Sequence, residues 1–552
     1  MPNWKTLRKK LQVYYQNTAW CNRDLIPIPP ERRTWGIWGY FGYWTVSGSC
    51  ISAWSTGSTL LAFGLSPREA IGCVIAGGLL TGLLAVACGW MGEKHHIGFT
   101  VASRFSWGMR GSYFPVLIRI FVAWAARLLE SLSAPSYQAG QQADMCISLM
   151  LMLLTGFAHM KNFFSESSHL ATNDFIGMLI WYAAFVPLVL VKPERLQVPF
   201  AVSFVLFATS CFGILIWAVV NAHGPGSMFT TTPSTINPGW GIMYGITAIL
   251  GAWGAGTLGQ SDWTRYANRR FAPTLSQLVA APVTIAVTAV VGIVVTSAAN
   301  DLLGQVVWNP IYLLADIQEY YHSSGRARAG VFFASLGMVS TQLAISVVLN
   351  SVSTGMDMAG LCPRYINIVR GSYIMAIIGI CTQPWQLLSA ATKFLSVLSG
   401  FGVFMAPLTG VLLADYHIVR RHRLNLHDLY TGNPSSIYWY FHGFNWRGPV
   451  AFVAGMWALL PGLIATVNND TNNPSLTGWI RLYNLTFLVG LAVSFTAMAV
   501  LGYLFPPPGL GLQKPFVVEG EEPGSSNKIE EVASTSGKME KEGKGNEGDS
   551  QV

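Results

Sequence analysis

Two ionisable side chains, Arg127 and Glu130, lie inside a long apolar run of the sequence. Their spacing of three residues places both on one face of a helix. An ionisable group in apolar surroundings is costly unless it is paired or faces a cavity. The two residues therefore form a structural salt bridge, or Glu130 binds ring N–H groups or a cation, or accepts a proton. Glu130 is a candidate for ligand binding and for proton transfer.

A second apolar run carries hydrogen-bonding side chains at a regular spacing. Gln342, Ser346 and Asn350 recur every four residues, which places them on one face of a helix. Such a face is typical of a cavity wall, although hydrogen bonds between neighbouring helices explain the same pattern. Ser346 and Asn350 are therefore candidate ligand-binding residues.

Two further runs contain small residues that weaken a helix. Ser47 and Cys50 belong to a Ser, Gly and Cys-rich stretch between Trp44 and Trp54, and Trp253 is the large residue in the Gly-rich stretch 251–256. An unwound stretch presents backbone carbonyls to a ligand, whereas the alternative is a small-residue face for close helix packing. These two runs are the first and sixth of the apolar runs that are long enough to span a membrane. Interruptions in the first and sixth membrane-spanning helices are typical of two inverted repeats of five helices each.

Membrane-spanning helices are needed to position these residues, and the composition supports them. The chain is 51% hydrophobic and 11% charged, whereas soluble domains carry about 25% charged residues. Because a bilayer core needs about 20 mainly apolar helical residues, the sequence predicts an all-α polytopic membrane protein with about twelve spans. Their limits are 36–62, 69–90, 115–138, 174–192, 198–220, 240–262, 276–299, 330–355, 372–391, 394–418, 447–467 and 480–504.

Basic residues alternate between the two sides of the predicted membrane. Segments with an even number of preceding spans carry most of the Lys and Arg, whereas 221–238 carries none. Arg326, Arg328 and Arg481 are the exceptions. Because Lys and Arg are retained on the cytoplasmic side, the pattern predicts that both termini are cytoplasmic.

The sequence argues against several other classes of protein. Its net charge of +8 comes from short basic clusters between apolar runs, so no nucleic-acid partner is expected. The adjacent His95 and His96 lack a third ligand at metal-binding spacing, and no CxxC pair occurs. No catalytic triad or phosphate-binding loop has a credible context, so neither an enzyme nor a cofactor is expected.

The two ends of the chain are polar. Residues 1–34 are expected to form a cytoplasmic segment that is not a signal peptide, and residues 35–505 the transporter domain. Residues 506–552 are rich in Pro, Gly, Ser, Glu and Lys and are expected to be a disordered cytoplasmic tail. The tail is either a solvated extension or a substrate of a ubiquitin ligase acting on its lysines.

From about Asn22 to Phe505 the chain resembles the nucleobase-cation symporter family, in its fungal branch of uracil, uridine, allantoin and thiamine-type permeases. The matching runs, in order, are NRDLIPIPPERRTWGIWGY, SRFSWGMRGSYFPVLIR, QSDWTRYA, ARAGVFF, LNSVSTGMDMAGLCPRYINIVRG and FNWRGPVA. The resemblance implies a leucine-transporter-like fold of five plus five inverted spans and two more, which works by alternating access at the plasma membrane.

The resemblance also implies a binding site. Family members hold a planar substrate between aromatic residues of spans six and three, and hydrogen-bond it with a Gln on span three and an Asn on span eight. Counting from the matched runs gives Trp253 for the span-six aromatic residue and Asn350 for the span-eight Asn. A Trp can stack on a flat ring, and an Asn offers both a donor and an acceptor.

Other positions depart from the family pattern. The span-three aromatic and Gln positions fall at Ala126 and Glu130, and the polar positions of span one fall at Ser47 and Cys50. An ionised Glu130 favours a cationic or donor-rich substrate, whereas a protonated one imitates the amide. In sodium-coupled relatives a Ser and a Thr of span eight bind the ion, but here those positions are Ala344 and Ile345, which favours protons.

These observations predict a proton-coupled importer of a small nitrogenous heterocycle similar to uracil, uridine or allantoin. Import of a cationic vitamin such as thiamine, pyridoxine or nicotinamide riboside is the first alternative. The second is a nutrient sensor that has the same fold but does not transport.

Overall fold

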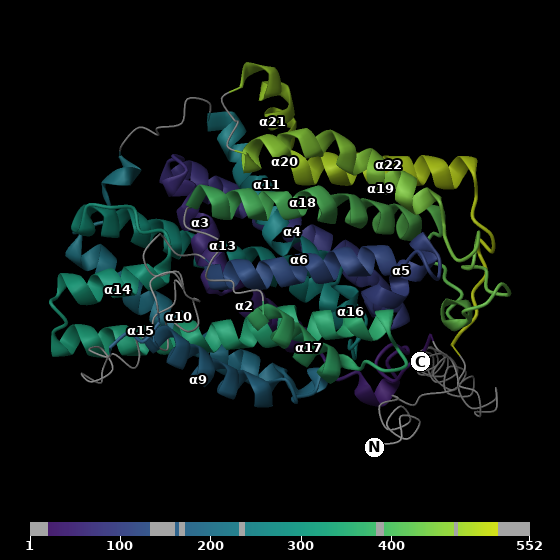
Figure 1. The fold of residues 1–552 in the computed structure, drawn as a ribbon, viewed down its shortest axis with the longest axis horizontal. Helices are drawn as coiled ribbons and strands as arrows, with labels where there is room; N and C mark the ends of the chain where they lie inside the picture. Colours follow the sequence, from purple (N-terminus) through teal and green to yellow (C-terminus); the bar gives the residue numbers. More distant parts are fainter. Residues whose placement is uncertain are drawn as a thin grey trace, which may run out of the picture.

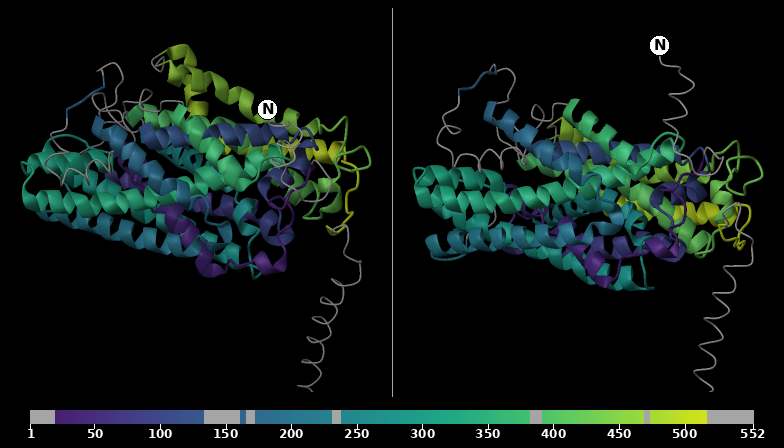
Figure 2. Two further views of the ribbon diagram at one scale, coloured as in Figure 1. Left: turned by 60° about the horizontal axis from the view of Figure 1, so that its bottom comes forward. Right: turned by 90° about the horizontal axis from the view of Figure 1, so that it is seen from below.

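The computed structural model describes residues 20–132, 161–164, 172–230, 238–381, 391–468 and 473–516. Helix dominates these ranges, and no strand of a sheet occurs in them. Figures 1 and 2 show the long helices lying side by side along one axis, with shorter helices and loops at both ends. The all-α architecture that the hydropathy predicts is confirmed.

Each predicted span corresponds to a helix or an interrupted helix. Eight helical stretches are long and apolar enough to cross a membrane, and shorter apolar helices occupy other predicted spans. In chain order the helices of the spans are α2 (Ile37–Gly48) with α3 (Ile51–Ala62), α4 (Pro67–His95), α6 (Tyr113–Leu132), α9 (Thr172–Leu188), α10 (Gln197–Asn221), α11 (Pro238–Leu258) with α12 (Ser261–Thr264), α13 (Ala272–Leu303), α15 (Gly325–Ile345) with η5 (Ser346–Val352) and α16 (Ser353–Leu361), α17 (Ile368–Cys381), α18 (Ala391–Leu413) with η7 (Ala414–Val419), α19 (Arg447–Met456) with α20 (Leu460–Val467), and α22 (Thr486–Leu504).

Within the described ranges, three further α-helices lie between the helices of the spans: α5 (Phe99–Trp107), α14 (Pro310–Tyr320) and α21 (Thr477–Tyr483). The span prediction did not include α5, because its nine residues are too few to cross a bilayer. All nine are buried, and α5 lies beside α6 and α16. This short helix therefore brings its first residues close to two spans that carry charged side chains.

The first span is interrupted as the sequence predicts, but the sixth is not interrupted at the predicted place. The helix stops at Gly48 and restarts at Ile51. In contrast, α11 runs without a break through 251–256 and ends at Leu258, so the predicted interruption there is wrong. The reason is packing, because a Cβ added to Gly251 would collide with the backbone carbonyl of Leu398 on α18. The break of span six lies instead at Gly259 and Gln260.

Gly251→Ala is therefore expected to destabilise the protein, because the new methyl group forces α11 away from α18. Overpacking of this kind costs about 1–3 kcal/mol, and the thermal unfolding midpoint of the purified protein would report it. Gly239→Ala is the matched control, because it lies on the same helix with no atom within 4 Å of its added Cβ. Equal unfolding midpoints for the two variants would contradict the close approach of α11 to α18 at Gly251.

The ends of the described chain lie on the same side of the molecule. Residues 22–35 form a strap, whose Asn22 Nδ2 donates to the carbonyl oxygen of Pro363 at 3.2 Å. At the other end of the strap, Trp35 N donates to the carbonyl oxygen of Tyr266 at 3.0 Å. Residues 506–516, which the sequence assigns to the disordered tail, are placed against the loops, with Phe516 against the ring of Tyr430. Residues 517–552 lie outside the described ranges.

Candidate functional site

The break in the first span leaves backbone carbonyls without helical partners, and side chains from other spans bind them. Trp253 Nε1 of α11 donates to the carbonyl oxygen of Ser47 at 3.2 Å. Thr341 Oγ1 of α15 donates to the carbonyl oxygen of Ser49 at 2.9 Å. Cys50 caps the following helix, because its sulfur accepts from Ala53 N at 3.4 Å. The unwound segment is thus tied to spans six and eight.

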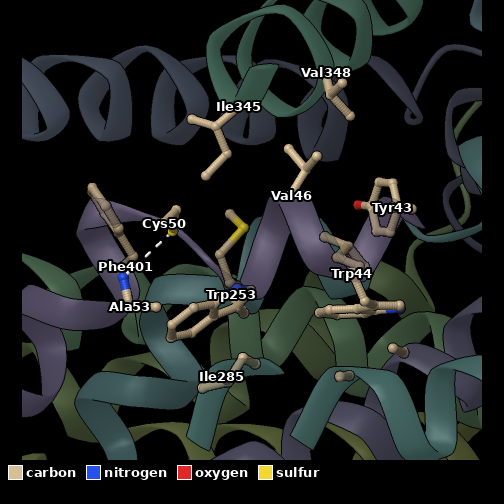
Figure 3. Packing of buried hydrophobic residues seen from close by; sticks show 14 of the residues in the cluster. Tyr43, Trp44, Val46, Cys50, Ala53, Trp253, Ile285, Ile345, Val348 and Phe401 are labelled. Atoms are coloured by element: carbon tan, nitrogen blue, oxygen red, sulfur yellow. Dashed lines mark hydrogen bonds between the residues drawn. The ribbon is translucent and has the colours of Figure 1, made fainter. Parts of the chain in front are cut away.

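A cavity lies beside this break. Figure 3 shows Trp253, Cys50 and Phe401 close together next to it, with Ile345 directed toward them from another helix. The lining is mainly apolar with a few polar groups, which is typical of a small-molecule site. Lining residues include Tyr43, Trp44, Ser47 and Cys50 from α2 and its break, Arg119 from α6, Ala252, Trp253 and Gly256 from α11, Ile345, Leu349, Asn350, Ser353, Thr354 and Asp357 from span eight, and Leu398 and Phe401 from α18.

Span eight changes its helical geometry at this cavity. Residues Ser346–Val352 form a π-helix, in which hydrogen bonds join residues five apart, so the four-residue spacing no longer places side chains on one face. Asn350 lines the cavity, whereas Ser346 is buried and is not among the lining residues. Such π-helical turns are frequent at functional sites.

Three buried charged residues meet at the edge of the cavity. Arg119 Nε donates to Asp357 Oδ2 at 2.7 Å, and Arg119 Nη2 donates to Asp262 Oδ2. The side chain of Arg119 is 3% exposed, and those of the two aspartates are 1% exposed. We call these three residues the charge cluster. It joins spans three, six and eight, and two of its members, Arg119 and Asp357, line the cavity.

Helix α5 supplies further hydrogen bonds to the charge cluster. Phe99 N, at the first position of α5, donates to Asp262 Oδ1 at 2.8 Å. Thr100 Oγ1 donates to Asp357 Oδ1 at 3.1 Å. The guanidinium carbon of Arg119 lies 4.4 Å from the centre of the Phe99 ring. Because the cluster holds two carboxylates and one guanidinium, these three side chains have one excess negative charge when both carboxylates are ionised, and the buried guanidinium of Arg265 attracts Asp262 from outside the cluster.

Several polar atoms of the lining have no hydrogen-bond partner within the described ranges. They are Trp44 Nε1, Ser47 Oγ and Arg119 Nη1, together with Thr354 Oγ1. A buried polar group without a partner is costly. The residues that carry these atoms line the cavity, and two of the atoms, on Trp44 and Arg119, act only as donors.

The structure brings together only some of the residues that the sequence singled out. Trp253, Asn350 and Ser47 line the cavity. Ala126 and Glu130 fall within α6, but their side chains lie outside the described part of the structure, as does that of Arg127. Their roles therefore stay predictions.

Sequence reasoning did not assign a role to Arg119, Asp262 or Asp357. A signal was present, because Arg119 and Asp262 fall inside predicted spans and Asp357 lies two residues beyond one. Intramembrane ionisable residues are functional candidates by default. The partners were hidden because Arg119 and Asp357 are 238 residues apart in the chain. Thr341 was missed for the same reason, since its partner Ser49 is 292 residues away.

Comparisons with known proteins give a consistent result. The family described as "Permease for cytosine/purines, uracil, thiamine, allantoin" matches residues 27–490. The chain is 31% identical to Transporter aclS of Aspergillus oryzae, over 90% of this chain and 88% of that protein. It is 32% identical to the allantoin permease of Saccharomyces cerevisiae, over 90% of this chain and 78% of that protein.

A solved structure supports the fold. The nucleobase-cation-symport-1 family transporter Mhp1, in a closed conformation with bromovinylhydantoin bound, superposes with a TM-score of 0.65 at 20% identity. The match covers 88% of this chain and 97% of Mhp1. At this identity the likeness concerns the fold alone.

Proposed function

Because the chain belongs to the family of permeases for cytosine/purines, uracil, thiamine and allantoin, we propose that it is a proton-coupled importer of a small, flat nitrogenous heterocycle. The observation that carries the proposal is the cavity beside the broken first span, with an indole, an amide and a charge cluster in its wall. Each of these groups has a distinct task in the proposed transport cycle.

Trp253 and Asn350 are the proposed substrate-binding residues. Trp253 is held by its bond to the carbonyl of Ser47, and an indole fixed in this way can stack on a planar ring. The amide of Asn350 offers a donor and an acceptor to the ring edge. Ala126 and Glu130 remain candidates on span three, and Ser346 is the weakest candidate because it does not line the cavity.

The unpartnered donors favour a substrate with ring carbonyl oxygens. The N–H groups of Trp44 and Arg119 can each donate to such an oxygen, and uracil and allantoin carry carbonyl oxygens directly on the ring. This argument favours a uracil- or allantoin-like ring over a cationic vitamin. An ionised Glu130 would instead favour a cationic substrate. The competition experiment therefore includes both carbonyl-bearing rings and cationic vitamins.

Proton coupling is the proposed driving force. Ile345, at a position where sodium-coupled relatives place an oxygen ligand, lines the cavity with a hydrocarbon side chain. The charge cluster has an excess negative charge that one proton would neutralise, and its Asp357 lines the cavity. Asp357 therefore joins Glu130 as a candidate carrier of the coupled proton.

The proposed location is the plasma membrane, with both termini in the cytoplasm. Support for the orientation comes from the basic residues of the even-numbered segments. The positions of the strap and of residues 506–516 at one end of the molecule agree with it. We call this end the cytoplasmic end.

Purified protein in proteoliposomes provides the test. An inward proton gradient is expected to drive accumulation of labelled uracil or allantoin above the equilibrium level. An inward sodium gradient at equal pH is expected to give no accumulation above that level. The same assay, with thiamine, pyridoxine and nicotinamide riboside as competitors, identifies the substrate class.

The alternatives predict different results. Inhibition by the cations alone would replace the carbonyl-ring proposal with the vitamin alternative. Saturable binding without any accumulation, for every compound tested, would indicate a sensor. Accumulation driven by sodium would refute the coupling proposal.

A further inference from the structure

A second cavity lies at the cytoplasmic end, away from the substrate cavity. Its wall is formed by the end of α4, residues 267–270 of the loop before α13, Arg33 of the strap and His422 after η7. The charged lining residues are Arg33, Lys94, Arg269, Arg270 and Glu93. We call this the basic cavity. It shares no lining residue with the cavity that contains Trp253 and Asn350.

Carboxylates of the described chain offset the cations of the basic cavity only in part, since Glu31 attracts Arg33 without forming an ion pair. None of Arg33, Lys94, Arg269 and Arg270 belongs to an ion pair within the described ranges. Their contacts are to carbonyls or rings: Arg33 Nε donates to Ile28 O at 2.9 Å, and Lys94 Nζ donates to His422 O at 3.0 Å. The cavity therefore contains unneutralised positive charge.

Glu93 offsets only part of this charge. Its carboxylate is already engaged at the beginning of α13, where Oε1 accepts from Phe271 N at 2.6 Å and Oε2 accepts from Thr274 Oγ1 at 2.8 Å. Four cations and one carboxylate line the cavity. The excess is positive, and the N-terminal end of a long helix adds to it.

The histidines add little charge. Burial lowers the pKa of His96 to about 4, with repulsion from Arg33 as a smaller contribution. Burial also lowers the pKa of His422, and Lys94 lowers it further. Both rings are therefore expected to be neutral near pH 7, so the positive charge comes from the arginines and the lysine.

An exposed apolar stripe on α13 leads away from the basic cavity. Leu275, Val279, Val283 and Val287 recur every four residues, and each is between 49% and 61% exposed. Phe271, 40% exposed, precedes them and lies next to the cavity. Since α13 is a candidate membrane span, hydrocarbon chains of the bilayer are the expected neighbours of this stripe.

Trp90 lies where the basic cavity and the stripe meet. Its ring stacks on His422, with centres 6.1 Å apart, and meets the edge of Phe271 at 6.2 Å. Trp is enriched at the level of lipid headgroups, where one side of the ring is apolar and the other is polar. The cavity therefore lies at the depth expected for a headgroup.

We propose that the basic cavity binds the phosphorylated headgroup of an anionic membrane lipid, whose chains lie along the Leu275 to Val287 stripe. Guanidinium groups bind phosphate oxygens in pairs, and basic pockets between spans on the cytoplasmic side suit such headgroups. The stripe favours a lipid over a free phosphate compound, because only a lipid has hydrocarbon chains that can contact the stripe. The inference rests on the proposed orientation but not on the identity of the transported substrate.

The test is a titration of the purified full chain in detergent with a lipid. The thermal unfolding midpoint of the protein is measured at each lipid concentration. A short-chain phosphatidylinositol 4-phosphate is expected to raise the midpoint, whereas short-chain phosphatidylcholine is not. In the variant R269Q/R270Q the apparent dissociation constant is expected to rise about 30-fold, because two cations near the lipid are lost. Both arginines are exposed, so the substitution should not disturb folding.

K192Q/R195Q is the matched control, because both residues are exposed and charged but lie outside the basic cavity. This control is expected to bind the lipid like the unmodified protein. Equal weakening of both variants would overturn the assigned site.

Two further arms identify the source of the phosphate. The inositol phosphate headgroup without chains is expected to give no comparable stabilisation, and an equal effect would assign the cavity to a free phosphate compound. A chain ending at Phe516 is expected to bind like the full chain. Binding that appears only after removal of residues 517–552 would show that the acidic tail occupies the cavity, which would overturn the lipid proposal.

Discussion

Asp357→Asn is expected to abolish proton-driven accumulation while leaving the protein folded. Asp357 is the cavity-lining carboxylate of the charge cluster, and its removal eliminates the excess negative charge that one proton would neutralise. The remaining Arg119 and Asp262 form a neutral pair. With its oxygen in the place of Oδ2 the asparagine can still accept from Arg119 Nε, and its Nδ2 can donate to the Thr100 hydroxyl, so the expected loss of stability is about 1–2 kcal/mol.

Proteoliposome assays separate coupling from binding in this variant. Exchange of labelled for unlabelled substrate across the membrane is expected to persist in Asp357→Asn, because exchange needs no net proton movement. Accumulation driven by a pH gradient should fall to background. Asp301→Asn, at an exposed carboxylate that binds Ser227, is the matched control and should accumulate substrate normally. Unchanged gradient-driven uptake by Asp357→Asn would leave Glu130 as the candidate proton carrier.

The same cluster predicts a contrasting result for Arg119→Gln. This change leaves two carboxylates, each 1% exposed, without their shared cation. Breaking a buried ion pair by removing one partner costs about 3–5 kcal/mol. Arg119→Gln is therefore expected to reduce the amount of folded protein, whereas Asp357→Asn is not. A stability loss as large in Asp357→Asn would mean that the cluster has a structural role only.

Asn350→Ala is expected to remove substrate recognition. The amide lines the cavity from the π-helical part of span eight, and among the described lining residues no other side chain offers both a donor and an acceptor on one planar group. Loss of its hydrogen bonds to a buried ring should raise the apparent dissociation constant about 10- to 100-fold. Uptake at low substrate concentration should then fall to background with normal surface expression.

Ser346→Ala is the matched control on the same π-helical segment. Ser346 is 3% exposed and does not line the cavity, so its uptake is expected to stay close to that of the unmodified protein. The regular four-residue spacing of the sequence predicts the opposite, with both residues in the site. Equal loss of uptake in the two variants would therefore contradict the position of Ser346.

The spans were predictable because hydropathy is a local property. Each predicted range overlaps a helix or an interrupted helix of the structure, and the eleventh predicted span, 447–467, has the same limits as α19 with α20. The break near Ser47 was also predictable, because several adjacent small and hydroxyl residues weaken a helix. The four-residue spacing of polar residues had already marked Asn350, and the family resemblance assigned ligand-binding roles to Trp253 and Asn350.

What the sequence missed depends on contacts between distant segments. The glycines of 251–256 suggest an unwound helix, but whether Gly251 serves a break or a close approach depends on Leu398 of another span. Likewise, a π-helical turn changes which side chains share a face, and no residue type signals it. The charge cluster is not visible in the sequence because its ion pairs join different helices, whereas residue spacing indicates only pairs within one helix, such as Arg127 and Glu130.

The excess charge of the cluster has a consequence for the response to membrane potential. If Asp357 carries the proton, the loaded carrier has a neutral cluster, and the empty carrier has one negative charge there. One elementary charge moving through 100 mV is worth about 2.3 kcal/mol. An inside-negative potential would then act mainly on the empty carrier and favour its return to the outward-facing state. The transport current should accordingly become voltage-independent when that return is no longer rate-limiting.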